Sequence, residues 1–212
     1  MPRIEYRNFR GERLPGVTTI ISGNLGWNTR PLMYWAWKEG MEGRDYRETS
    51  ETAAVVGTIA HAMVEADLKG KKFDASPYPP ELVDKAETAY LAWLEWKDLV
   101  GFRVVASEVS LIHEELGFGG TLDLVAIKKK RCVSDLKTSS NVYPEHKIQI
   151  AAYKELWNYN HPTELIEGGL YLLRIDKVDA SFHYHHWLCL NEAWEAFKHL
   201  LALHNLQKTL KR

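Results

Sequence analysis

The hydrophobic period of this sequence changes abruptly just after residue 100, and that change limits what the chain can fold into. Over residues 81–100 apolar side chains recur at helical spacing, and Gly101 follows as a helix stop. Short runs rich in β-branched residues come next, at 103–112, 119–127 and 131–136, with turn residues between them. Such runs predict strands. We therefore expect a long helix followed directly by three consecutive strands.

The other segments of the chain continue with helical or strand patterns. Besides the helix over 81–100, we expect one short helix introduced by 14–21, one after Pro31, and others over 50–68, 143–159 and 191–210. Two further strands are expected at 168–175 and 180–188, and a proline-rich connector at 74–80. This order predicts an α/β fold of mixed α+β character, in which helices flank a central mixed β-sheet.

The length and composition suit one globular domain. A chain of 212 residues can bury a substantial core. Its 45% hydrophobic and 26% charged residues are typical of a soluble protein. We expect a single domain over 1–212, with an N-terminal elaboration at 1–50, the core at 51–189 and a C-terminal helix at 190–212.

Composition also excludes several classes of protein. The two cysteines, Cys132 and Cys189, are too few for a disulfide framework or a four-cysteine metal cluster, which indicates a reducing, cytoplasmic environment. No apolar run reaches membrane-spanning length, and the polar start is not a signal peptide. The net charge of -1 gives no general attraction to nucleic acid, so any such binding must use local basic patches.

Acid-x-lysine triplets occur four times, at 67–69, 95–97, 135–137 and 145–147. Three of them fall on predicted helices or helix starts, where side chains two residues apart point in different directions. Asp135-Leu136-Lys137 instead falls on a predicted strand, where residues two apart share a face. Asp135 and Lys137 can therefore reach the same reaction centre.

A second acid, Asp123, lies twelve residues before Asp135 on the preceding predicted strand. A tight hairpin with its turn at 128–130 brings the two carboxylates side by side. Paired carboxylates on neighbouring strands suit hard cations that keep several waters and take phosphate oxygens as further ligands. Lys137 could then orient or deprotonate an attacking water and offset the charge that develops on phosphorus. The pattern predicts phosphodiester chemistry.

The strand context and spacing of these residues resemble the PD-(D/E)XK nuclease superfamily. With His61 upstream, the resemblance narrows to its RecB-like exonuclease branch, which includes many phage exonucleases and the mitochondrial genome-maintenance exonuclease. The stretches that carry it, in family order, are 14–21, 57–61 with Glu65, Glu108, 120–123, 135–137 and 149–153.

The resemblance implies a restriction-endonuclease-like core with a metal site. His61, Asp123, Asp135 and the carbonyl of Leu136 are expected to bind the metal, and Lys137 is expected to be the catalytic lysine. One or two Mg²⁺ or Mn²⁺ ions are implied. A histidine ligand favours Mn²⁺ somewhat, because imidazole is softer than carboxylate. Enzymes of this branch that hold an iron–sulphur cluster need four cysteines, so that cofactor is excluded.

Three more residues receive roles from the resemblance. Glu108 is expected to be a catalytic, supporting acid near a second metal. Gln149 and Tyr153 lie one helical turn apart, which suits contacts to the substrate. Glu108 could instead simply face water, and Gln149 and Tyr153 could be a helix surface and a core aromatic.

The expected function is metal-dependent hydrolysis of DNA phosphodiester bonds in replication, recombination or repair. The family branch favours an exonuclease acting on single-stranded DNA ends, of a kind that phages also encode. Two alternatives stay open: a structure-specific or restriction-type endonuclease, and a non-catalytic nucleic-acid-binding protein that retains the fold. No membrane partner is expected.

Three other groups have more ordinary interpretations. The basic segment 128–131 is expected to be a solvated hairpin tip, although it could touch a phosphate. The histidines of the 180–188 strand are expected to be structural or surface residues rather than a metal cluster: His183, His185 and His186. An N-terminal aromatic group is expected to pack in the core, or alternatively to stack on unpaired bases at a tunnel or arch: Trp27, Tyr34, Trp35 and Trp37.

Overall fold

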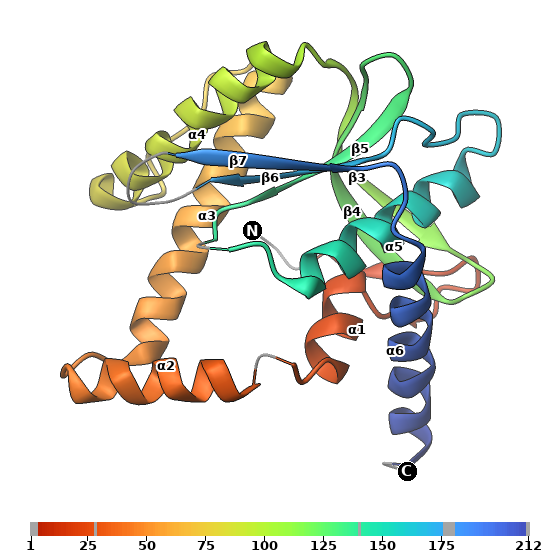
Figure 1. Cartoon of the computed structure of the whole chain (residues 1–212), viewed down its shortest axis with the longest axis horizontal. Coiled ribbons are helices and arrows are strands. Elements are labelled where there is room, and N and C mark those ends of the chain that lie inside the picture. The colour runs from red at the N-terminus through yellow and green to blue at the C-terminus, as the bar shows by residue number, and fades with distance from the viewer. Residues whose placement is uncertain (1–3, 28, 140, 176–180, 211–212) are drawn as a thin grey trace.

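A computed structural model describes residues 4–27, 29–139, 141–175 and 181–210. Its helices are α1 Val17–Asn24, α2 Thr29–Met41, α3 Tyr46–Leu68, α4 Pro80–Val100, α5 Pro144–Asn160 and α6 Asn191–Leu210 (Figure 1). Its strands are β1 Tyr6–Arg7, β2 Arg13–Leu14, β3 Arg103–His113, β4 Phe118–Ile127, β5 Arg131–Lys137, β6 Leu170–Ile175 and β7 Phe182–Trp187.

The two long helices α3 and α4 begin and end at recognisable caps. Asp45 precedes α3, and its carboxylate accepts a hydrogen bond from the Arg47 backbone N–H at 2.8 Å. This cap starts α3 four residues earlier than the expected Ser50. In α4, Pro80 occupies the first turn, and Gly101 ends the helix in the left-handed conformation with φ 68°.

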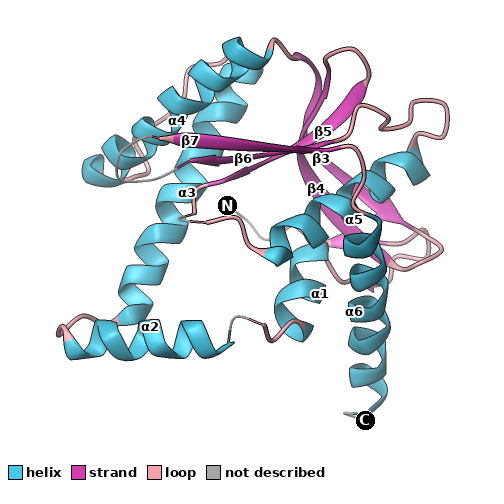
Figure 2. Ribbon diagram, in the orientation of Figure 1, coloured by secondary structure: helices cyan, strands magenta, loops and turns pink. Residues whose placement is uncertain are grey.

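Five strands form one mixed sheet in the order β3-β4-β5-β6-β7. β5 and β6 pair in parallel, and the other neighbours pair antiparallel. Parallel neighbours need a crossover connection, and α5 lies on it. Helices lie on both faces of the sheet (Figure 2). The predicted fold class, a central mixed sheet flanked by helices, is confirmed.

Each face of the sheet has its own hydrophobic core. On one face α1, α5 and α6 pack against the sheet around Phe118, Leu156 and Phe197, which are fully buried. On the other face α3 and α4 do the same around Ile59 and Trp96. The polar cleft described below lies where helices of the two faces approach the same end of the sheet.

The N-terminal hairpin of β1 and β2 was not expected from the sequence. Its two-residue strands are too short to show any hydrophobic period. The hairpin is held to the sheet by Tyr6, whose hydroxyl lies 2.9 Å from Thr121 Oγ1. The ring of Tyr6 rests where Gly119 has no side chain. A pair of glycines, Gly119 and Gly120, therefore makes β4 accessible from both sides.

Two strands begin two residues later than expected, and the other boundaries of the five sheet strands agree with the expected ones to within one residue. β6 begins at Leu170 rather than at 168, because Gly169 takes a positive φ of 91° that extended strands do not adopt. β7 covers Phe182–Trp187, and the expected start at Ala180 lies outside the described residues.

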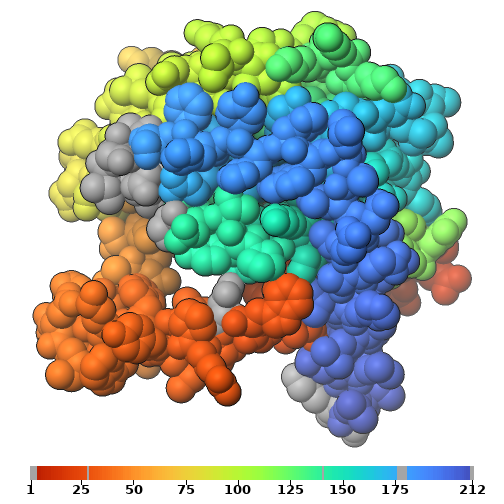
Figure 3. All heavy atoms as spheres, in the orientation of Figure 1, coloured from red at the N-terminus to blue at the C-terminus, as the bar shows by residue number. Residues whose placement is uncertain are grey.

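The expectation that the N-terminal aromatic group packs in the core is wrong for most of its members. Trp27, Tyr34 and Trp37 are 61%, 65% and 58% exposed. The reason is the position of α2, which links α1 to α3 away from the sheet and so has no sheet face to bury against (Figure 1). The space-filling view shows α2 and its neighbours, in orange, projecting from the body of the molecule (Figure 3).

Two further features bear on the protein's class. No helix in the described ranges combines the length and apolar character needed to cross a lipid bilayer. Cys132 is buried and Cys189 is exposed, and both are free thiols.

The close packing at Gly120 gives a test of this fold. A Cβ built there would lie 2.8 Å from Leu156 Cδ1 and 2.9 Å from Tyr153 Cε1. We expect Gly120→Ala to lower the free energy of unfolding by about 1–3 kcal/mol through overpacking. Chemical denaturation followed by tryptophan fluorescence measures the loss.

Gly23→Ala in α1 is the matched control, because nothing lies within 4 Å of a Cβ built at Gly23. This helical glycine should gain about 0.5–1 kcal/mol on substitution. Equal stability of the two variants would contradict the close approach of α5 to β4.

Candidate active site

The site begins where the pairing of β4 and β5 stops. The last register pair of this ladder is Leu124 with Ser134. Beyond it, Asp123 Oδ2 accepts a hydrogen bond from the Leu136 backbone N–H at 2.8 Å, so a side chain takes the place of a main-chain carbonyl. This bond keeps Asp123 beside the end of β5. The expected closeness of Asp123 to the Asp135–Lys137 segment is therefore present in the structure.

Glu108 enters the site from the neighbouring strand β3. It lies between the register pairs Ser107–Leu124 and Val109–Leu122, and so stands opposite Asp123. Its φ of 50° is the only positive value at a non-glycine residue among those described. A strained backbone of this kind persists where surrounding structure imposes it, which is commonly at functional sites.

His61 reaches the same end of the cleft from helix α3. Gly57, one turn before it, allows α3 to approach β5, since a Cβ built there would lie 3.0 Å from Thr138 Oγ1. His61 Nε2 lies 3.2 Å from the Leu136 carbonyl oxygen, and its Nδ1 lies 3.7 Å from Asp123 Oδ2. The imidazole therefore faces both a carboxylate and a carbonyl that were expected to share its metal.

Three side chains together offer a set of metal ligands. One donor atom each from His61, Glu108 and Asp123 lie within 4.8 Å of one another. Two carboxylates and an imidazole suit Mn²⁺ or Mg²⁺ in the presence of further water or phosphate ligands. The structure thus brings Glu108, which was expected to be a supporting acid near a second metal, into one group with His61 and Asp123.

Asp135 lies deeper, next to the lysine of the same strand. It is fully buried, and its Oδ2 lies 2.7 Å from Lys137 Nζ. Among the described residues no further hydrogen bond to its carboxylate oxygens is found beside this ion pair. A buried carboxylate with one close partner remains costly, and a cation beside Asp123 would compensate it further. The residues present therefore fit a divalent ion.

The pKa values of the acids show the same crowding of negative charge. Burial raises the pKa of Glu108 to about 7, and the nearby Asp123 carboxylate adds to the effect. Burial also raises the pKa of Asp135, although Lys137 opposes the shift. Burial lowers the pKa of Lys137, but the negative charges of Asp135 and Asp123 outweigh it and leave the pKa raised. Lys137 therefore stays an ammonium ion at neutral pH.

The Gln149 and Tyr153 pair lies beside these groups on α5. Gln149 Nε2 donates a hydrogen bond to the Tyr153 hydroxyl at 2.8 Å. Burial, followed by the charges of Asp135 and Asp123, raises the pKa of Tyr153 well above 10, so the phenol stays neutral. Tyr153 lines the cleft, and Gln149 holds the tyrosine rather than forming part of the wall.

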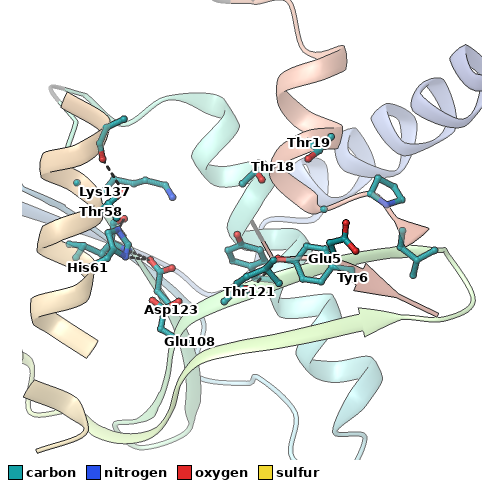
Figure 4. Close-up of a pocket in the computed structure, with 18 of the residues that line it drawn as sticks. Glu5, Tyr6, Thr18, Thr19, Thr58, His61, Glu108, Thr121, Asp123 and Lys137 are labelled. Carbon is teal, nitrogen blue, oxygen red and sulfur yellow. Dashed lines mark hydrogen bonds and ion pairs between the residues drawn. The ribbon is translucent and has the colours of Figure 1, made fainter. Parts of the chain in front are cut away.

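These residues occupy one end of an open cleft of about 1260 Å³. His61, Glu108, Asp123 and Lys137 cluster at this end, and Thr18, Thr19 and Tyr6 lie at the other (Figure 4). Sequence reasoning missed a set of polar residues in the far wall: Tyr6, Arg13, Thr18, Thr19, His204 and Lys208. Of these, Thr18 and Thr19 lie within the stretch 14–21 that carried the family resemblance, which was the available signal.

Two of the other acid-x-lysine triplets contribute ion pairs within or between helices α3 and α4. Lys97 of α4 and Asp67 of α3 form an ion pair with a Nζ–Oδ2 distance of 2.9 Å. Lys69 pairs with Glu65 one turn before it in α3. These pairs lie outside the cleft, so the strand-borne triplet is distinguished by its position in the fold, as its secondary structure predicted.

The sequence comparison with protein families decides the family. The sequence model of the PD-(D/E)XK nuclease superfamily matches residues 33–204. The chain belongs to this superfamily. Nucleases of the PD-(D/E)XK superfamily use divalent metals, which agrees with the His61, Glu108 and Asp123 group. No curated protein sequence is similar enough to this chain to count as a relative.

Solved structures with the same fold include exonucleases. A candidate exonuclease from Eubacterium rectale aligns with a TM-score of 0.52 and 16% identity, over 76% of this chain and 66% of that chain. The match thus spans just under two thirds of that protein. An alkaline exonuclease from Laribacter hongkongensis aligns with a TM-score of 0.43 and 13% identity, over 75% of this PD-(D/E)XK chain and 87% of the other. At 16% identity, the likeness to the Eubacterium rectale structure shows the fold alone.

The raised pKa of Glu108 predicts that metal binding depends on pH. Below a pH of about 7 the carboxyl is protonated and must lose its proton to bind a cation. We expect the apparent Kd for Mn²⁺ to rise by up to about tenfold for each pH unit below 7. Isothermal titration calorimetry in buffers of different ionisation enthalpy measures both the affinity and the proton release.

Glu108→Gln is the diagnostic variant, because it keeps the size of the side chain and removes its titration. It should bind Mn²⁺ more weakly at pH 8 and release fewer protons at pH 6. Unchanged proton release in this variant would show that another group titrates.

Proposed function

We propose that this protein is a metal-dependent deoxyribonuclease that hydrolyses phosphodiester bonds, acting as an exonuclease with a preference for single-stranded DNA ends. One observation carries the proposal. Lys137 and Asp135 stand 2.7 Å apart on β5, beside the ligand group of His61, Glu108 and Asp123, in a cleft that is open to a polymer.

The acids and the histidine account for the metal requirement. A divalent cation held by His61, Asp123, Asp135 and the Leu136 carbonyl, with Glu108 serving it or a second ion, supplies charge stabilisation and an acidified water. His61 and Asp123 are positioned in advance, because the Leu136 main chain contacts both through its carbonyl and its N–H. Such preorganisation lowers the cost of assembling the site.

Lys137 is the positively charged side chain that we assign to catalysis. Its ammonium group is held against Asp135 and is 20% exposed at the cleft. From this position it orients the attacking water towards phosphorus and offsets the negative charge that builds up in the transition state. Since its pKa is raised, the lysine acts as a charge rather than as a proton acceptor at neutral pH.

Tyr153 is suited to contact a phosphate or sugar near the scissile bond. Its hydroxyl accepts the Gln149 amide hydrogen, which leaves its own hydrogen free to be donated. The phenol is neutral and its ring is fixed by packing next to Gly120, so the Tyr153 hydroxyl presents its hydrogen in a fixed direction. Gln149 is then a positioning residue for the tyrosine.

The exposed aromatic side chains near the cleft support a single-stranded substrate. α2 joins α1 to α3, whose residues form two walls of the cleft. Tyr34 and Trp37 on α2 have ring centroids 5.6 Å apart and are largely exposed. Aromatic surfaces of this kind stack on unpaired bases, which a duplex does not offer.

The catalytic assignment predicts a large loss of activity from changes at β5. We expect Lys137→Ala and Asp135→Ala each to lower kcat on labelled single-stranded DNA with Mn²⁺ by at least about 10²–10³-fold. Lys129→Ala at the β4–β5 turn is the control, since Lys129 is exposed and distant along the strand. Retention of full activity by either β5 variant would refute the site.

If the enzyme is a single-strand exonuclease, its cleavage should require a free DNA end, and its DNA binding should require the exposed aromatic side chains of α2. The enzyme should degrade a linear single strand and leave a closed circular strand intact, whereas an endonuclease would cut both. Tyr34→Ala and Trp37→Ala should each weaken single-strand binding by about 1–3 kcal/mol, measured by fluorescence anisotropy. Leu99→Ala, which removes an exposed apolar side chain from α4, should leave binding unchanged.

A further inference from the structure

A row of nitrogen-bearing side chains leads away from the catalytic lysine across the sheet. Lys137 on β5 is the register partner of Arg174 on β6, and Arg174 is the partner of His183 on β7. Register partners on adjacent strands point to the same face of a sheet. His185, two residues along β7, shares this face with His183. The row therefore starts in the cleft and ends at the edge strand.

A lysine from α5 completes this surface. Lys147 Nζ lies 5.5 Å from the centre of the Trp187 ring, and His185 stacks on the same tryptophan with ring centroids 5.5 Å apart. Burial lowers the pKa of His185, and the nearby charges of His183, Lys147 and Arg174 lower it further. The side chains of β7 and of the start of α5 adjoin on one face of the molecule (Figure 3). We call Lys147, His183 and His185 the β7 surface; Arg174 is buried beneath it and donates a hydrogen bond to the Ser139 carbonyl at 3.3 Å.

Exposure and charge suit the β7 surface to an anion. Lys147, His183 and His185 are exposed. Within the described part of the chain, no ion pair joins any of these three to a carboxylate. The Lys147 ammonium adds a local positive charge, and the ring N–H groups of His183 and His185 add hydrogen-bond donors, although the whole chain carries a net charge of -1. A local basic patch is what nucleic-acid binding by such a chain requires.

The length of the row fits a short stretch of DNA backbone. Strands in a sheet lie about 4.8 Å apart, so the two steps from Lys137 to His183 cover about 10 Å. Phosphates of an extended single strand lie farther apart than the axial rise of duplex DNA, which is about 3.4 Å, so the row spans about two of them. Lys137, at the start of the row, is the lysine proposed to face the scissile phosphate, and a strand that passes from it to His183 leads out of the active site.

We propose that the β7 surface binds the sugar–phosphate backbone of the DNA strand next to the bond being cut. This inference rests on the proposed nuclease function and adds the path of the strand outside the cleft. Lys147 supplies charge to the phosphates, and His183 and His185 supply ring N–H donors. The contacts are to the backbone, so they hold the strand without selecting its sequence.

Binding measured without cleavage tests the path directly. Anisotropy of a labelled single-stranded oligonucleotide is followed in EDTA at increasing salt concentrations, at pH 8. We expect Lys147→Ala to raise Kd roughly threefold and to lower the slope of log K against log salt by about 0.7, the value for one lost phosphate contact. Lys147→Arg should keep the slope. Lys85→Ala, an exposed lysine of α4 on the opposite face of the sheet, is the control and should behave as wild type.

Two substrates separate this inference from the proposed function. Lys147→Ala and His185→Ala should raise KM for a long single strand and leave Mn²⁺-dependent hydrolysis of bis(p-nitrophenyl) phosphate unchanged, since that small diester does not reach β7. An unchanged salt slope and KM in both variants would overturn the path while the nuclease stands. Failure of the wild type to cleave either substrate would overturn the nuclease, and the salt slope of Lys147→Ala would still decide whether the surface binds DNA.

Discussion

The hydrogen bond from the Leu136 main chain to the Asp123 carboxylate organises the catalytic end of this molecule. The main-chain pairing of β4 and β5 is regular up to Leu124 and Ser134 and ends there. Because the Asp123 carboxylate accepts the Leu136 N–H, β4 and β5 stay side by side beyond the last main-chain pair. The Leu136 carbonyl oxygen in turn lies next to His61, which approaches from helix α3. Strand, helix and acid are thereby fixed relative to one another through one residue.

This arrangement concentrates more negative charge than the chain alone compensates. Asp123, Asp135 and Glu108 lie on three adjacent strands, and Lys137 is the cation that contacts them most directly, 2.7 Å from Asp135. Burial and mutual repulsion raise the pKa of Glu108 to about 7. The crowding costs folding free energy, and a divalent cation relieves it. The same geometry that weakens the metal-free protein is what gives the site affinity for a metal.

The surroundings of the site divide into a rigid part and an exposed part. Tyr153, Gly120 and the Tyr6 hairpin pack closely around β4 and fix one side of the cleft. α2 contributes no residue to the cleft wall and carries exposed aromatic rings between the two helices that do. The β7 surface lies on the sheet beyond Lys137, outside the cleft lining. In the roles proposed above, hydrolysis, strand binding and strand guidance belong to different elements of the fold.

The sequence alone predicted, in their order, the six helices and the five strands of the central sheet that the described residues form, and it placed Asp135 and Lys137 on one face of a strand. The change of hydrophobic period marked β3 to β5, and the strand position of Asp135-Leu136-Lys137 separated it from three similar triplets, because alternation on a strand is a local property. Asp123 followed from the predicted hairpin that joins its strand to that of Asp135, and His61 and Glu108 followed from the family resemblance. The tertiary structure decided what depends on distant contacts. It placed Glu108 in the ligand group with a positive φ, brought Tyr6, Arg13 and Lys208 into the far wall, and left the α2 aromatics exposed. Exposure and convergence depend on what packs against a segment, and no local pattern records that.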